Sequence, residues 1–535
     1  MRIEKLVLLG LSLALIQRAG AQDLESLLDE GAKTSQTPGA VGAPAKTTPL
    51  SQAIKKILGT PSSEQNIFLR YLENAEWDKA VLQYPAAFAG TSFQKSATGR
   101  ALQGYLQFQA GLPITGVQTL FLADPPAEIN ATLRDEWVKL APVEHFAWDL
   151  AQVPWTPAWE QVFGERLEMR IKTVLALQAG SPDLEALQKL SAQAQNNSKE
   201  KGLLDWQLVL GSSLQDQADR AAKLLANLMK SKNSPVREDL MQLTAARLLY
   251  QNGYFSAAIK YYEKLPKTSE YWTEAQEEMA WAYIRKGEPQ NALALSQTLV
   301  ASDLNYQVGP EAFFVRALSQ LKVCDYTGVT ETLKSFPKRF KERTQRLSQL
   351  SQNSTGEVTE KALALLAAKK IQQKDLGKAA QTLPRRLARD EKLYQLVQAQ
   401  KHWEAEAQAA EKLYAKSLAL TGLQGVLDSL KQSTLQKAQA AKNAAYGRVK
   451  DLATEEVNET QEILRKLHIV EAELLQQVSI ADRIAKNAKG QEEKKGVTGS
   501  KGSADAVSFP AEDELWFDEL SNYRVDVKKA CTVKR

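Results

Sequence analysis

The side chains that most often carry chemistry are few and scattered in this sequence. Its three histidines, His145, His402 and His468, have no second histidine or cysteine at a spacing that would hold a metal ion. The glycine-rich stretch GVTGSKGS (residues 496–503) lacks the residue spacing of a phosphate-binding loop and has no strand before it. No serine lies in a nucleophile elbow. We therefore predict no catalytic residue, no metal site and no cofactor, and expect that the chain is not an enzyme.

The two cysteines, Cys324 and Cys531, are the other reactive side chains. In an exported protein an even pair is a disulfide candidate. A bridge that closes so long a loop would contribute about 4–5 kcal/mol on the chain-entropy model, before strain is subtracted. Two unrelated buried thiols are the alternative, and the residues alone leave both open.

The N-terminus has the three parts of a secretory signal. Arg2 and Lys5 precede an apolar run from Leu6 to Ile16, and the small residues Ala19 to Ala21 follow it. This apolar run is too short to span a bilayer comfortably, and no other stretch of 18 apolar residues occurs. We therefore expect an exported chain, with the periplasm as its compartment and no transmembrane segment after signal removal.

Composition favours an all-α fold. Only 28 glycines and 19 prolines stand among abundant alanine, leucine, glutamine, lysine and glutamate. Basic residues do not concentrate on one domain, so we expect no nucleic-acid partner. Two short basic runs, Lys338–Arg343 and Arg385–Arg389, are interpreted as solvated helix faces.

A repeated pattern lies in the middle of the chain. Each copy has a small residue, then glycine or cysteine seven positions later, then a small residue five positions further on. The copies are Ala246, Gly253 and Ala258; Ala280, Gly287 and Ala292, which lie 34 residues later; and Ala317, Cys324 and Val329, which lie 37 residues further on. Fainter copies occur around Trp77 and Ala80, around Gly104, Gly111 and Gly116, and around Ala222.

The pattern predicts an α-solenoid of helical hairpins. Small residues let the two helices of a hairpin approach closely, and glycine supplies the backbone angles of the turn. One hairpin alone would leave an apolar face uncovered, so the copies must stack. The first helices would line a concave groove that binds a protein or peptide. The predicted groove residues are Arg247, Tyr250, Gln251, Glu277, Trp281, Arg285, Phe314 and Lys322.

Beyond residue 340 the sequence predicts long helices. No proline occurs between Arg385 and Phe509, and Ile463, Leu467, Val470 and Leu474 alternate spacings of four and three, the seam of a two-helix coiled contact. We expect a few long helices over residues 350–487, folded back near residues 420–425. The seam is compatible with packing inside the monomer and with dimerisation.

After a linker rich in charge, glycine and serine, the chain ends in the apolar residues Trp516, Phe517 and Leu520, which we expect to dock back on the folded body, on the copy that contains Cys324. The predicted organisation is a signal peptide (1–21), a disordered linker (22–50), degenerate helical repeats with a tryptophan-rich insertion (51–240), the clear repeats (241–340), a long helical, coiled-coil-like region (341–488), a linker (489–510) and a C-terminal docking segment (511–535).

The runs YWTEAQEEMAWAYIRKGEPQNALALSQTL and GPEAFFVRALSQLKVCDY, with the final DELWFDELSNYRVDVKKAC, resemble tetratricopeptide repeat (TPR) proteins of deltaproteobacteria and predatory relatives, some linked to gliding-motility and envelope machinery. The resemblance covers about residues 250–326 and the last segment. It implies an exported periplasmic scaffold with a paired cysteine. The sequence departs from the usual repeat at Ser296, where a large residue is expected, and at Cys324, where glycine is expected.

Two functions follow as expectations. The first is a periplasmic TPR scaffold that binds other cell-envelope proteins or peptides through the concave groove. The second is a structural envelope component that oligomerises through the Ile463–Leu474 seam and uses the repeats as a spacer.

Overall fold

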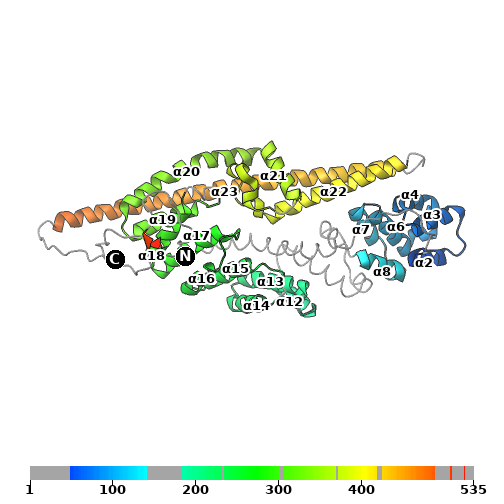
Figure 1. The fold of residues 1–535 in the computed structure, drawn as a ribbon, viewed down its shortest axis with the longest axis horizontal. Helices are drawn as coiled ribbons and strands as arrows, with labels where there is room; N and C mark the ends of the chain where they lie inside the picture. The colour runs from blue at the N-terminus through cyan, green and yellow to red at the C-terminus, as the bar shows by residue number, and fades with distance from the viewer. Residues whose placement is uncertain are drawn as a thin grey trace. The chain divides into compact units, whose positions relative to one another are not determined.

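The computed structural model describes residues 48–140, 183–196, 198–231, 234–301, 307–368, 371–417, 424–488, 507–508 and 523–524. Over these residues the chain is all-α, as predicted (Figure 1). No helix among them is long and apolar enough to cross a membrane. The predicted signal peptide, the tryptophan-rich interval, Trp516 and Cys531 lie outside the described residues.

The chain divides into two compact units. The first contains residues 1–217, 226–236 and 394–445, and the second contains residues 218–225, 237–393 and 446–535. The first unit holds α2 (Pro49–Leu58), α3 (Ser63–Glu73), α4 (Trp77–Phe88), α5 (Ser92–Lys95), α6 (Ala97–Gln109), α7 (Pro113–Phe121), the 3-10 helix η1 (Pro126–Glu128), α8 (Ala131–Leu140), α12 (Leu184–Gln193) and α13 (Lys199–Leu214).

The second unit holds α15 (Glu238–Gln251), α16 (Phe255–Tyr262), α17 (Trp272–Lys286), α18 (Pro289–Leu299), α19 (Glu311–Lys322), α20 (Tyr326–Gln352), α21 (Glu357–Ala368), the 3-10 helices η4 (Gln373–Gln381) and η5 (Leu387–Arg389), and the strands β1 (Val507–Ser508) and β2 (Tyr523–Arg524). Three helices have residues in both units: α14 (Ala218–Lys230), α22 (Glu391–Lys416) and α23 (Gln424–Ala488).

In the described part of the chain, one turn geometry recurs at the end of six helices. The residue at the turn has a positive φ and donates its backbone N–H to the carbonyl three residues earlier. The next residue donates to the carbonyl five residues earlier, at 2.8 to 2.9 Å. These two bonds define a Schellman motif, which satisfies carbonyls that the helix end leaves unpaired. The six turn residues are Ala75, Gly111, Asp216, Gly253, Gly287 and Cys324.

These turns confirm that the predicted positions are equivalent and add two more. Cys324 adopts a φ of 58°, the left-handed conformation of Gly253 and Gly287. Ala75 and Asp216 adopt it as well, although neither is glycine. The turn at Asp216 corrects the register of the upstream copy, because the residue five positions later is Ala221. Ala221 is fully buried, whereas the predicted Ala222 is exposed.

Small residues bring the two helices of each hairpin together. The alanines of the clear repeats at positions 246, 258, 280, 292 and 317 have no exposed surface. In the first unit, Gly104 on α6 and Gly116 on α7 take the corresponding places. A Cβ atom on either glycine would lie 2.5 Å from the other's carbonyl oxygen. Alanine therefore cannot replace either glycine without moving the backbone of this hairpin.

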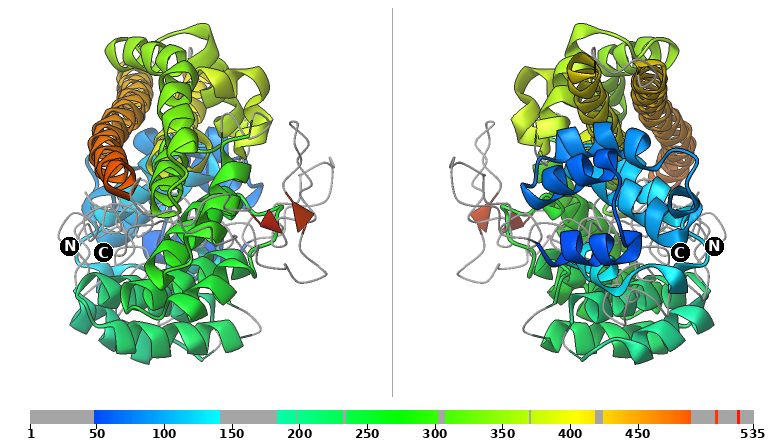
Figure 2. Two further views of the ribbon diagram at one scale, coloured as in Figure 1. Left: turned by 90° about the vertical axis from the view of Figure 1, so that its left-hand side faces the viewer. Right: turned by 90° about the vertical axis from the view of Figure 1, so that its right-hand side faces the viewer.

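Consecutive helices pack on one another in the second unit. From α15 to α20, each helix contacts the next, and α17 also contacts α19. A stack of hairpins requires this order of contacts, because each hairpin covers the apolar flank of its neighbour. Strand β2 pairs in parallel with β1 and contacts α18 (Figure 2). This part of the predicted docking segment therefore lies on the repeats. It contacts α18, the second helix of the copy before the one that contains Cys324.

The predicted coiled seam packs inside the chain. Ile463, Leu467, Val470 and Leu474 of α23 form one buried cluster with aromatic and aliphatic residues of α19 and α20. Their partners include Phe313, Phe336 and Phe340, whose rings contact one another at 4.8 to 5.7 Å between centroids. Figure 1 shows α20 beside the later part of α23. Of the two arrangements that the spacing allowed, the structure has the intramolecular one.

Helix α20 crosses the predicted boundary at residue 340. It runs from Tyr326 to Gln352 with Pro337 inside it, so the second helix of the last clear repeat continues into the region expected to be separate. The region after it is also less regular than predicted. A short helix, α21, and two 3-10 segments precede the two long helices α22 and α23.

We predict that Gly287→Ala and Gly447→Ala change stability in opposite directions. A Cβ atom at either glycine would meet no atom within 4 Å. At Gly287, alanine would have to hold a φ of 88°, which costs about 1–2 kcal/mol. At Gly447, inside α23, alanine is the better helix former and should stabilise by about 0.5–1 kcal/mol. Urea unfolding of the purified chain measures both, and a Gly287→Ala variant as stable as the parent would contradict the turn assignment.

Candidate functional site

The predicted groove residues lie on α15, α17 and α19, and the chain's own later segments cover part of them. The covered part is the first turns of α17 and α19. Arg389 pairs with Glu274 of α17, Arg385 lies against Gly309 just before α19, and Lys466 of α23 lies over the Phe314 ring of α19. At the opposite ends of the same helices Gln251, Arg285 and Lys322 are exposed. Each of the three lies two residues before a left-handed turn residue.

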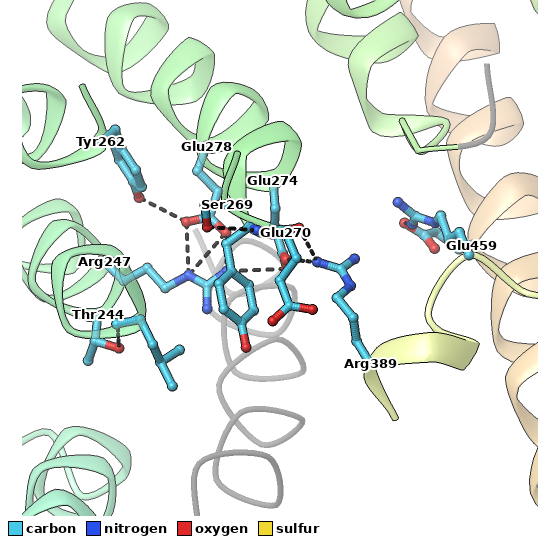
Figure 3. Close-up of polar contacts among 12 residues, drawn as sticks. Thr244, Arg247, Tyr262, Ser269, Glu270, Glu274, Glu278, Arg389 and Glu459 are labelled. Carbon is cyan, nitrogen blue, oxygen red and sulfur yellow. Dashed lines mark hydrogen bonds and ion pairs between the residues drawn. The ribbon is translucent and has the colours of Figure 1, made fainter. Parts of the chain in front are cut away.

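Arg247 differs most from its prediction as a groove residue. Its side chain is buried, and its Nε donates to both oxygens of Glu278, at 3.0 and 2.9 Å. Glu274 lies 3.2 Å away, and the Tyr262 hydroxyl donates to Glu278 at 3.0 Å (Figure 3). Burial alone would lower the pKa of Arg247, but the two carboxylates raise it above its usual value. Arg247 thus joins α15 to α17 and is not available to a partner.

Arg389 extends this network to the segment before α22. Its Nη1 donates to the Glu274 carboxylate and to the backbone carbonyl of Glu270, both at 3.1 Å (Figure 3). Its guanidinium lies 5.9 Å from the centre of the Tyr271 ring, and that of Arg237 lies 5.5 Å from the same ring. Carboxylate, carbonyl and aromatic face together suit a planar guanidinium group.

Arg385 lies between the repeats and α23. Its backbone N–H donates to Glu456 at 2.9 Å, and its guanidinium pairs with Glu459. A Cβ atom at Gly309 would lie 2.2 Å from Nη1 of Arg385, so a larger residue here would displace the guanidinium from its present position. The Gly309 N–H in turn donates to Glu277 at 3.1 Å. The guanidinium is thus held in a cradle between Gly309 and α23.

Carboxyl groups of three helices surround this cradle. Burial raises the pKa of Glu277 to about 8, against the opposing charge of Arg385 and with the help of Glu311 and Glu459. Burial also raises the pKa of Glu311, which accepts a hydrogen bond from the Trp281 indole at 3.1 Å. For Glu459, burial acts in the same direction, but Arg385 and Arg386 lower its pKa below its usual value.

Arg343 and Arg448 hold the same region from α20 and α23. Arg343 donates to Glu456 at 2.6 Å and to the carbonyls of residues 380, 381 and 383 at 3.2, 3.3 and 3.1 Å. Arg448 binds both oxygens of Asp390, at 3.1 and 2.7 Å. Four arginines of the second unit therefore connect the repeats, the 383–390 segment and α23.

The two basic runs are not solvated along their whole length, contrary to the sequence prediction. Lys338–Arg343 and Arg385–Arg389 were expected to be solvated faces, yet Arg343, Arg385 and Arg389 point inward and are paired. Their partners Glu456 and Glu459 lie about 70 residues or more away in sequence. The sequence around these arginines did not indicate that they are paired, because their acidic partners are distant in sequence and acidic residues are common on exposed helices.

The aromatic groove residues are half-buried. Trp281 packs on Phe314, with ring centres 5.7 Å apart, and Lys466 of α23 lies 5.8 Å from the Phe314 ring. Tyr250 packs on Phe255 at 5.5 Å. Trp281 was predicted as a groove residue, but it packs between hairpins against Phe314 and Glu311 of α19, and Phe314 also contacts Lys466 of α23.

A buried carboxylate in the first unit was not predicted. Glu406 of α22 has no exposed surface and accepts hydrogen bonds from the backbone N–H and the hydroxyl of Thr115, at 3.1 and 2.7 Å, and from the N–H of Ile114. These N–H groups form the first turn of α7, where a helix favours negative charge. Burial raises the pKa of Glu406 to about 6, against these hydrogen bonds. Around it, Leu82, Leu112 and Leu413 form an apolar contact.

The remaining candidate residues stay apart. Burial lowers the pKa of His402 to about 4, with Lys401 adding to the effect, and His468 is exposed beside Glu471. In the described part of the chain no group of three metal-ligating side chains comes together. Cys324 is disulfide-bonded, whereas Cys531, its proposed partner, is outside the described residues. Comparison with models of known protein families and with curated proteins finds no match for this chain.

We predict that Arg247→Met destabilises the chain far more than Arg285→Met. The first change leaves the Glu278 carboxylate buried without its cation, while Glu274 keeps Arg389, and an unmatched buried charge costs about 3–5 kcal/mol. The second removes an exposed side chain and should stay within about 0.5 kcal/mol. Thermal unfolding of the two purified variants makes the comparison, and equal losses would show that Arg247 is not a buried ion-pair centre.

We predict that Glu277→Gln stabilises the chain at high pH. Because the folded-state pKa of Glu277 is raised from 4.5 to about 8, the folded chain keeps a proton that the unfolded chain releases. The free energy of unfolding therefore falls as pH rises from 4.5 to 8 and levels off above 8. Glutamine removes this fall, so the gain should exceed about 1 kcal/mol at pH 8.5 and shrink towards pH 5. Denaturant unfolding at the two pH values tests this, and a gain independent of pH would refute it.

Proposed function

We propose that the chain is an exported scaffold of the TPR type that binds other cell-envelope proteins through its helical repeats. The observation that carries this proposal is the regular exposure of equivalent positions on three successive hairpins. Gln251, Arg285 and Lys322 occupy the same place relative to their turns and are exposed, although the first turns of α17 and α19 are covered. A regular row of exposed side chains on stacked helices is the surface with which such arrays bind extended peptides.

The chemistry of this row suits a peptide. Tyr250 and Leu318 lie half-buried near the exposed amide and cations. Aromatic or aliphatic anchors beside charged groups are common at binding hot spots. Arg285 and Lys322 also stand in the last turns of their helices, where positive charge is favourable.

The envelope location rests on the N-terminal signal pattern and on the disulfide of Cys324, because disulfides persist in oxidising compartments. The structural alternative, oligomerisation through the Ile463–Leu474 seam, has less support. In the structure those four side chains are buried against α19 and α20 of the same chain.

We predict that a photo-crosslinking amino acid at Gln251 or Lys322 captures an envelope protein in cells that express the chain. The same probe at Lys260, exposed on α16 and away from the row, is the matched control and should capture none. Arg285→Glu should then reduce capture from Gln251 at least about tenfold, because it reverses the charge between the two probe sites. Equal capture from Gln251 and Lys260, or none from any site, would reject the proposal.

A further inference from the structure

The first turns of α17 and α19 form an acidic surface that already holds arginine. Glu274 and Glu277 come from α17, and Glu311 comes from α19. Two arginines that the repeats themselves supply, Arg237 and Arg247, are engaged elsewhere. Arg237 pairs with Asp239 and Glu270, and Arg247 pairs chiefly with Glu278. The carboxylate of Glu274 pairs with Arg389, and Glu277, whose raised pKa keeps its carboxyl group largely protonated at neutral pH, lies near Arg385.

Three features of this surface suit guanidinium rather than ammonium. The Nη1 atom of Arg389 donates to the Glu274 carboxylate and to the Glu270 carbonyl, both at 3.1 Å. The face of Tyr271 lies 5.9 Å from the same group. Gly309 leaves room for the flat Arg385 head, since a Cβ atom there would lie 2.6 Å from its Cζ. Lysine is a point charge without a plane, so it would use none of the three fully.

We propose that this surface is a recognition site for an Arg-x-x-x-Arg segment and that residues 384–390 are its occupant in cis. Arg385 and Arg389 are separated by three residues, and the 3-10 turn η5 (Leu387–Arg389) lies between them. Arg389 reaches Glu274 of α17, while Arg385 lies against Gly309, which precedes α19, and pairs with Glu459 of α23 on its other side. A partner that enters the acidic part of the groove therefore carries two arginines at this spacing and displaces the internal segment. This inference rests on the proposed function in one respect: it names the chemistry of the partner that the groove binds.

Because residues 384–390 already occupy the site, a partner must compete with this segment to bind. A segment tethered to the same unit acts at an effective concentration in the millimolar range for a short linker. A free peptide of the same sequence should thus bind the intact chain weakly. Removal of the two internal arginine side chains should free the carboxylates with which they pair, although Arg343 and Arg448 still hold the segment's backbone and Asp390.

The experiment uses the purified full-length chain and a fluorescein-labelled peptide of residues 382–393, TLPRRLARDEKL. The peptide should bind the Arg385→Ala/Arg389→Ala variant at least about tenfold more tightly than it binds the parent. The matched control is Lys338→Ala/Lys341→Ala, which removes two exposed cations from α20 and should bind like the parent. A second peptide with lysine in place of Arg385 and Arg389, and with Arg386 unchanged, should lose at least about tenfold in affinity for the opened variant.

Addition of Glu274→Gln and Glu277→Gln to the opened variant should abolish its preference for arginine. If the double alanine variant loses helicity, Arg389→Ala alone serves, because Arg385 keeps its bond to Glu459, and the expected gain is about threefold. Equal affinity for the arginine and lysine peptides, or equal binding by the parent and the variant, would overturn the inference. Because no envelope protein is involved, this outcome is independent of the crosslinking result at Gln251.

Discussion

A guanidinium group cannot release its proton inside a protein, so every buried arginine must keep hydrogen-bonding partners. The second unit depends on this constraint. Arg247 joins α15 to α17, and Arg385 joins the 383–390 segment to α23. Arg343 joins α20 to α23 and to the backbone carbonyls of residues 380, 381 and 383. Any rearrangement that breaks one of these pairs while its members stay buried leaves a cation or a carboxylate unmatched. The packing of the long helix on the repeats is thus specified by charge as well as by apolar contact.

The hairpin turns show how a repeat persists when its residues change. Six turns share the same two hydrogen bonds and a positive φ, yet their residues are alanine, glycine, aspartate and cysteine. The geometry arises because the last carbonyls of a helix need hydrogen-bond donors. Glycine is not essential to it and only lowers the conformational free energy of the positive φ. Where glycine is present, the period of 34 residues is visible in the sequence. Where alanine or aspartate occupies the turn, as at Ala75 and Asp216, the same hairpin looks irregular.

Local pattern was sufficient for part of the molecule. The helical composition, the spacing of Ala246, Gly253 and Ala258 and the alternation from Ile463 to Leu474 predicted the fold class, the hairpin turns and the buried face of α23. What covers that face could not be predicted, because a heptad seam has the same form within a chain and between chains. The candidate site was harder still. Arg343 and Arg385 are interior only because Glu456 and Glu459 reach them from distant sequence positions.

The aliphatic seam and the arginines have different roles in placing α23. A seam of Ile463, Leu467, Val470 and Leu474 buries apolar surface, but shifting such a helix by one heptad would place similar side chains in similar spaces. The ion pairs do not tolerate this shift, because Glu456 and Glu459 would move by about 10 Å along the helix axis and leave Arg343 and Arg385 without their carboxylate partners. We infer that apolar burial supplies the stability of the contact and that the arginines fix its register. The repeats likewise contact arginines of the chain's own 383–390 segment, since Arg389 pairs with Glu274 in the first turn of α17 and Arg385 lies against Gly309, just before α19. The rest of the fold fixes the position of these arginines, so they can define how the segment and the repeats align.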